Sequence, residues 1–190
     1  LKRYDSFEPG TMDHAAYGVK VLFDEGMIRR FLPDDKWDSI IYTAIAHHSD
    51  YELPEISDPQ TLLHAKLIRD EDKLDNCRVK LVDSTSTFIN VSEEELGTQN
   101  ITQKVYETVF KNKCILSADR VTQMDYWVSY IVYFFDINFK ESFDIIAEND
   151  YLNRIIDRIP YSNPVTKEQM ENIRVYMQNF INSHTNGQSF

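Results

Sequence analysis

The spacing of apolar residues predicts helices along almost the whole chain. The clearest pattern lies in residues 34–50, where apolar side chains follow the i, i+4, i+7, i+8, i+11 spacing of one helix face: Trp37, Ile41, Ala44, Ile45 and His48. Residues 11–28 form a second predicted helix. Residues 58–84 form a third, which is apolar on two faces, as is typical of the central helix of a bundle.

The second half of the chain continues the helical pattern. Further helices are predicted in 101–110, 119–139, 143–160 (one broken helix or two short ones) and 164–181, with capping boxes at Ser92–Glu95 and Thr166–Gln169. The aromatic stripe of residues 127–134 is interpreted as core. Residues 84–92 look like a loop, which predicts two parts, 1–84 and 85–190, packed in one all-α domain.

Composition and charge limit the classes of function. Hydrophobic residues make up 42% of the 190-residue chain, and only 5 Gly and 6 Pro are present, which disfavours a turn-rich β fold. The net charge is −11 without a basic stripe, so long nucleic acid and membrane surfaces are not expected partners. Cys77 and Cys114 are not spaced as metal ligands or as a redox pair. We therefore interpret them as reduced core residues of a cytoplasmic protein.

Histidines and acids on apolar helix faces are the candidate chemistry. His47 and His48 end the stripe of residues 34–50, and "KLIRDEDKLD" (66–75) sets three aspartates among apolar residues. Neutral imidazole and carboxylate suit first-row transition metals. A lone histidine is more often a hydrogen-bonded core residue, and periodicity alone does not say which aspartate matters.

Three motifs in order, "DHAAYGVKVL", "AIAHHSDYELP" and "KLIRDEDKLD", resemble the HD-domain superfamily of metal-dependent phosphohydrolases. The resemblance covers roughly the first 85 residues. It implies an HD-domain-like helical bundle with additional C-terminal helices. It also implies metal-assisted hydrolysis of a small phosphoester, with a nucleotide as the expected substrate, because the acidic surface disfavours a polymer.

The resemblance also implies metal ligands at four positions: His14, His47, His48 and Asp72. His14, His48 and Asp72 are expected to converge, with His47 at the rim, around an ion of Fe, Mn, Zn, Ni or Co. Asp70 and Asp75 are expected to be supporting or structural. Arg69 and Lys73 flank Asp72 and are candidates to contact a substrate phosphate, with solvated or ion-paired side chains as the alternative.

The chain departs from the family pattern because it contains no HD dipeptide. Its first residues resemble the segment that follows the HD helix, so the upstream helices are expected to be absent from this sequence. No catalytic residue is therefore assigned, and residues 1–190 alone are expected to bind metal weakly. The alternatives are a non-catalytic HD-fold module that binds a ligand or partner and a plain helical scaffold.

Overall fold

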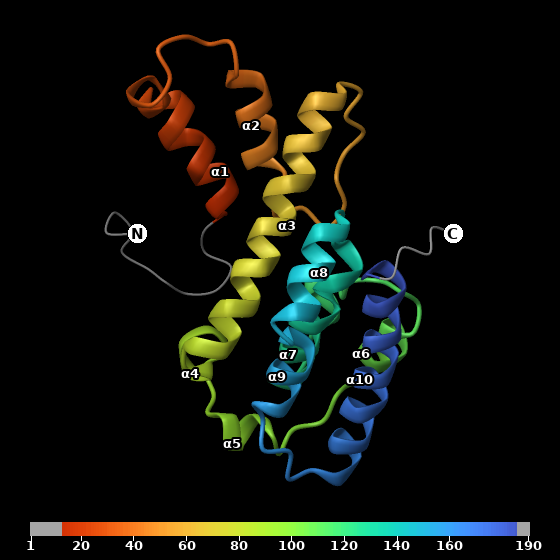
Figure 1. Ribbon diagram of the computed structural model, residues 1–190. Helices are drawn as coiled ribbons and strands as arrows, with labels where there is room; N and C mark the ends of the chain where they lie inside the picture. The colour runs from red at the N-terminus through yellow and green to blue at the C-terminus, as the bar shows by residue number, and fades with distance from the viewer. Residues whose placement is uncertain (1–12, 186–190) are drawn as a thin grey trace. The chain divides into compact units, whose positions relative to one another are not determined.

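Helices form all the regular structure in residues 13–185, the part of the chain that the computed structural model describes, and no strand occurs there (Figure 1). The all-α prediction is therefore confirmed. The α-helices are α1 (His14–Val19), α2 (Asp38–Ala46), α3 (Pro59–Val82), α4 (Thr85–Ile89), α5 (Glu93–Leu96), α6 (Gln103–Val109), α7 (Gln123–Ile131), α8 (Lys140–Glu148), α9 (Tyr151–Asp157) and α10 (Pro164–Thr185). Across these helices of residues 13–185, no segment is both long and apolar enough to span a bilayer.

The chain divides into two compact units, and the boundary falls inside α3, between Arg69 and Asp70. The sequence placed its subdivision later, in the loop predicted for residues 84–92. That segment instead contains α4, whose C-terminal cap Asn90 lies in the left-handed region (φ 61°). The loop prediction is wrong here because a single helical turn of Thr, Ser, Phe and Ile carries too short a pattern to reveal a helix.

The first unit is built from short helical pieces. The helix predicted for residues 11–28 is α1, a π-helical turn (Lys20–Asp24) and a 3₁₀ turn (Met27–Arg30), separated by Gly26 with φ 71°. Asp13 caps α1 by accepting a hydrogen bond from the Ala16 N–H. Helical segments this short bury few apolar side chains within residues 13–69: Ala15, Val19, Ile28, Ala44 and Ala65.

Helix α2 is shorter at both ends than the helix predicted for residues 34–50. It starts at Asp38 and ends at Ala46, so His47 is its C-terminal cap and His48 lies in the turn beyond. The sequence placed His48 on the face of a helix that extends to residue 50, and this placement is wrong because the helix ends before His48.

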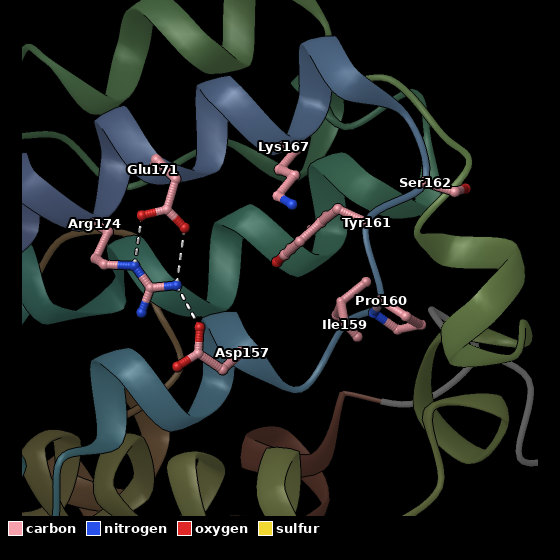
Figure 2. Close-up of a pocket in the computed structure, with 8 residues that line it drawn as sticks. All are labelled: Asp157, Ile159, Pro160, Tyr161, Ser162, Lys167, Glu171 and Arg174. Carbon is pink, nitrogen blue, oxygen red and sulfur yellow. Dashed lines mark hydrogen bonds and ion pairs between the residues drawn. The ribbon is translucent and has the colours of Figure 1, made fainter.

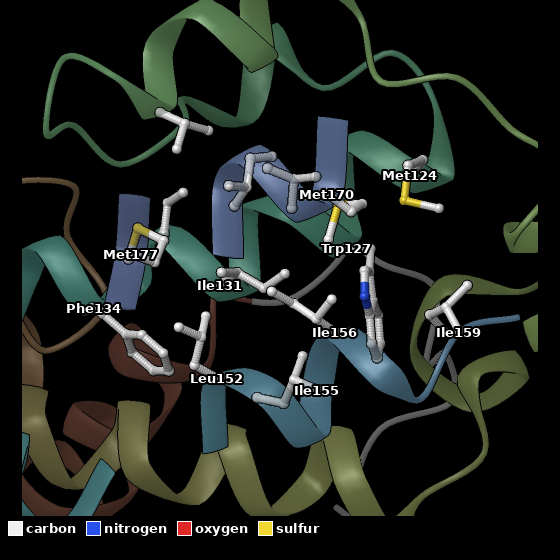
Figure 3. Close-up of a cluster of buried hydrophobic side chains, with 14 of the residues drawn as sticks. Met124, Trp127, Ile131, Phe134, Leu152, Ile155, Ile156, Ile159, Met170 and Met177 are labelled. Carbon is white, nitrogen blue, oxygen red and sulfur yellow. The ribbon is translucent and has the colours of Figure 1, made fainter. Parts of the chain in front are cut away.

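The second unit contains a large apolar core that α7, α8, α9 and α10 share (Figure 3). Helix α10 packs against α8 and α9, and α4 contacts α7. Trp127, Ile131 and Phe134 are at most 1% exposed, which confirms that the aromatic stripe is core.

Helix caps in the second unit follow the sequence only in part. The capping box predicted at Thr166 is wrong: α10 begins at Pro164, and the Asn163 side chain accepts from the N–H groups of Val165 and Thr166. Thr166 is buried and donates to the carbonyl of Gln99. A complete capping box forms instead at Thr122, at the start of α7.

Candidate functional site

Two histidine side chains from different elements meet in the first unit. His14 opens α1, and His48 lies in the turn after α2. Their Nε2 atoms are 2.8 Å apart, their ring centroids are 4.7 Å apart, and the ring planes are inclined by 74°. The contact is a hydrogen bond between imidazoles, so one proton lies between the two Nε2 atoms.

A glycine lets α1 and α2 come close enough for this contact. The two helices pack against each other, and Gly18 lies one turn after His14. A Cβ placed on Gly18 would be 3.3 Å from Cγ2 of Ile45, which is tighter than ordinary van der Waals contact. The absence of a side chain at Gly18 therefore contributes to the approach that brings the histidines together.

The backbone determines the tautomer of His48. Its Nδ1 lies 2.7 Å from the carbonyl oxygen of Ile45. Because a carbonyl oxygen can only accept, Nδ1 of His48 carries the hydrogen and Nε2 of the neutral ring holds a lone pair. His14 then donates its Nε2–H to His48. His48 has the backbone-anchored Nδ1–H that is usual for metal-ligating histidines.

The geometry of the pair fits two adjacent ligands of one metal ion. With metal–nitrogen bonds of about 2.0–2.1 Å, nitrogens 2.8 Å apart subtend an angle of about 90° at the ion, as in six-coordinate sites. A tetrahedral ion would need a slight opening of the pair. No cluster of three or more His, Cys, Asp or Glu side chains suited to a metal occurs within residues 13–185.

His47 is directed to another partner. Its Nδ1 lies 2.7 Å from Oδ2 of Asp50, and both side chains are substantially exposed. In residues 13–69, no hydrogen bond or ring contact joins His47 to the His14–His48 pair. Its predicted role as an additional ligand stays a prediction.

Arg69 shapes the turn that carries His48. It is 1% exposed, and its Nη1 donates to the carbonyls of His47, His48 and Asp50 at 3.0, 3.3 and 2.7 Å. These oxygens follow the end of α2, where carbonyls lack intrahelical partners. The sequence reading missed this role. The phosphate contact predicted for Arg69 stays a prediction.

In the second unit, two residues of α3 that lie three positions apart contact the segment before α8. Asp70, 1% exposed, accepts hydrogen bonds from the backbone N–H groups of Asn138 and Phe139 and from the Asn138 side chain. Lys73 is also buried, and its ammonium lies 2.7 Å from Asp136. Asp70 is thus structural, as the sequence allowed. A phosphate-binding role for Lys73 stays a prediction.

Asp72 belongs to the second unit and is partly buried. Its Oδ2 accepts a hydrogen bond from Nδ2 of Asn76 at 3.3 Å. Lys80 continues this line of polar residues and donates to Oδ1 of Asn76 at 3.4 Å. Asn76 and Lys80 were missed at the sequence level, although their spacing of four residues from Asp72 was a usable signal. Asp72 as a metal ligand stays a prediction.

A pocket of about 380 Å³ lies between the end of α9 and the start of α10 (Figure 2). Arg174 lines it and is paired with Glu171 and Asp157. Burial raises the pKa of the Tyr161 phenol, which keeps the hydroxyl protonated. Lys167 and Arg174 are matched in charge by two carboxylates, so the pocket offers no net charge to a ligand.

Comparison of the chain with protein-family models, curated proteins and solved structures finds no match.

Proposed function

We propose that this protein is a metal-dependent phosphohydrolase of the HD type that acts on a small phosphoester, with a nucleotide as the substrate class. The His14–His48 pair carries the proposal, because it sets two Nε2 atoms 2.8 Å apart with the tautomer of His48 chosen by the Ile45 carbonyl. The order of the three sequence motifs supports the same assignment. The donors fit a first-row transition ion, which is Fe, Mn, Zn, Ni or Co.

Each residue of the site has a separate role in this proposal. His14 and His48 would hold the ion through Nε2, with the hydrogen of the neutral His14 ring then on Nδ1. Arg69 keeps the turn of His48 in place through three carbonyls. The bound ion supplies a water of lowered pKa and offsets the charge of the phosphoryl oxygens.

The net charge of the chain supports a small phosphoester as the substrate, and the state of the cysteines supports the cytoplasm as the location. A chain with net charge −11 repels polyanions, whereas a small phosphoester can be held by an ion in a local site. Cys77 and Cys114 are not joined in a disulfide, in agreement with the reducing cytoplasm as the proposed location of the protein.

The test is a titration of the protein with Co²⁺, followed by visible absorption, and a hydrolysis assay with nucleotides and a generic phosphodiester. We expect His14→Ala and His48→Ala each to weaken Co²⁺ binding at least tenfold, because each removes one Nε2 donor. His64→Ala is the matched control, since His64 is an exposed histidine of the same unit.

Two results would overturn the proposal in different ways. Co²⁺ binding that survives both histidine substitutions would show that the pair is only a hydrogen bond. Tight binding without hydrolysis of any substrate would favour a non-catalytic HD-fold module instead.

A further inference from the structure

One face of α10 and the end of α9 line the pocket of about 380 Å³ in the second unit (Figure 2). Lys167, Glu171 and Arg174 follow the i, i+4, i+7 spacing, so they project from the same side of α10. Asp157 lines the pocket from the end of α9, and Tyr161 lines it from the loop between the two helices. Pockets of about this volume hold small molecules.

The loop that carries Tyr161 is fixed by contacts with residue Gly97. The backbone N–H groups of Ser162 and Asn163 both donate to the Gly97 carbonyl at 3.1 Å. A Cβ on Gly97 would lie 2.3 Å from the carbonyl oxygen of Pro160, so the loop approaches this position too closely for any side chain. The wall of the pocket is therefore preformed, as is usual for small-molecule sites.

The acidic end of the pocket is a cluster around Arg174. The guanidinium donates to both carboxylate oxygens of Glu171, to Oδ1 of Asp157 and to the side chain of Asn153. One cation between two carboxylates leaves the cluster with an excess of one negative charge. Oδ2 of Asp157 accepts no hydrogen bond within residues 70–185, so this oxygen is open to a cationic group.

The basic end of the pocket is Lys167. Figure 2 shows its side chain and the Tyr161 hydroxyl directed into the same space. Within residues 70–185, no hydrogen bond or ion pair engages the Lys167 ammonium. It therefore balances the charge of the Arg174 cluster across the pocket without contacting a carboxylate.

The Tyr161 hydroxyl adds a neutral donor beside Lys167. Its oxygen is buried and has no hydrogen-bond partner within residues 70–185. Burial raises the pKa of this phenol, so the hydroxyl keeps its hydrogen at neutral pH. The nearby indole N–H of Trp127 can only donate, so it cannot accept that hydrogen. An ammonium and a hydroxyl that both lack an acceptor suit the oxygens of a carboxylate.

We infer that this pocket binds a free α-amino acid with an apolar side chain. The carboxylate of the ligand binds Lys167 and Tyr161, and its ammonium binds Oδ2 of Asp157. The apolar side chain lies against Ile159 and Pro160. A zwitterion fits better than a simple anion or cation, because the charges that line the pocket are separated and balanced. The inference goes beyond the proposed function and does not depend on the histidine pair.

The experiment is a calorimetric titration of the full chain with L-leucine and two analogues that each lack one charged group. Isocaproate lacks the ammonium, and isoamylamine lacks the carboxylate. We expect L-leucine to bind at least tenfold more tightly than either analogue, because each analogue leaves one charged hydrogen bond unmade.

Substitutions at the two ends of the pocket should affect different analogues. Lys167→Met should weaken binding of L-leucine at least tenfold and leave binding of isoamylamine unchanged, since only the carboxylate contacts Lys167. Asp157→Asn should weaken L-leucine in the same way and leave isocaproate unchanged. A general distortion of the pocket would weaken all three ligands together.

Tyr161→Phe separates binding from stability. It removes a hydroxyl without a hydrogen-bond partner, so the melting temperature should not fall, while L-leucine should bind about tenfold more weakly. The matched controls are Lys111→Met and Tyr151→Phe, which lie in the second unit outside the pocket and should bind L-leucine as the unchanged protein does.

Three results would overturn the inference. If L-leucine does not bind at millimolar concentration, the pocket is only a hydrated surface hollow. If isocaproate binds as tightly as L-leucine, the site takes simple anions and the assignment to amino acids is wrong. If the control variants weaken binding as much as Lys167→Met, binding lies elsewhere. Each result leaves the proposed function untouched, since His14→Ala and His48→Ala should bind L-leucine normally.

Discussion

Within residues 13–69, the buried apolar side chains of the first unit are three alanines, Val19 and Ile28, whereas the second unit buries Trp127, Phe134 and a set of isoleucines and methionines that pack together. The helical segments of the first unit that precede α3 are also short and include π and 3₁₀ turns, while the second unit contains the 22-residue α10. Burial of apolar surface is the main stabilising contribution in folding, so most of the stability belongs to the second unit.

The histidine pair thus lies in the less stabilised part of the molecule. Its geometry depends on individual contacts: the Ile45 carbonyl on His48, the missing side chain of Gly18 and the three carbonyl contacts of Arg69. Regions with few buried apolar contacts open more easily than a core, and functional sites are commonly drawn from them. A metal ion held by both histidines would stabilise this unit by mass action.

The largest expected difference between the units comes from matched isoleucine truncations. Ile131→Ala should lower the free energy of unfolding by about 2–5 kcal/mol, because Ile131 is fully buried in the second unit's core. Ile28→Ala, in the thin core of the first unit, should cost at most about 2 kcal/mol, since its surroundings can collapse into the space. Urea unfolding followed by far-UV circular dichroism measures both, and equal costs would contradict the comparison.

A pair of glycines gives a smaller contrast. A Cβ on Gly97 would lie 2.3 Å from the Pro160 carbonyl oxygen, which cannot move without disturbing the backbone, so Gly97→Ala should cost about 1–3 kcal/mol. Gly18→Ala meets only a side-chain methyl of Ile45 at 3.3 Å and gains helix propensity, so it should change stability by less than about 1 kcal/mol. Thermal unfolding of the two variants ranks them, and the reverse order would show that the first unit is the more rigid one.

The smallest expected effect is the pH dependence that Lys80 imposes on the second unit. Burial lowers its pKa to about 8, opposed by the charges of Cys77, Asp83 and Asp72. The unfolded chain therefore binds more protons at this residue from below pH 8 up to about pH 10.4, and stability rises with pH in that window. Relative to Lys80→Met, the free energy of unfolding should increase by about 1 kcal/mol from pH 7 to pH 9.

Urea unfolding of the unchanged protein and of Lys80→Met at pH 7 and pH 9 measures this difference. Ionisable groups that are the same in the two proteins contribute equally to both, so their effects cancel. Lys104→Met, which removes an exposed and ion-paired lysine, should show no such trend. A stability difference that is flat or falls with pH would mean that Lys80 is not a desolvated cation.

The periodic pattern predicted the helices well wherever they are long. The helix predicted for residues 58–84 is α3, and Asp58 caps its start by accepting from the N–H of Thr61. The helix of residues 164–181 is α10. Errors occur at short elements and ends, at α4 and at the end of α2, because one helical turn contains too few apolar positions to establish a period.

The candidate site could be predicted as a set of residue types but not as a geometry. The order of the motifs singled out His14 and His48, and local spacing could have added Asn76 and Lys80. Nothing local could have shown that Arg69 and Asp70, adjacent in the sequence, serve different segments. Their partners are tens of residues away along the chain and are chosen by how the helices pack.

By itself the sequence determined the all-α class, the long helices and the net charge of −11, because periodicity and charge can be read from the residues along the chain. Only the tertiary structure decided which polar side chains meet: the two Nε2 atoms of the histidine pair, the carbonyls that Arg69 binds and the rings that hold Lys80. The physical reason is that burial leaves a polar group no water to bind, so its partner must come from whatever the packing of the helices places beside it.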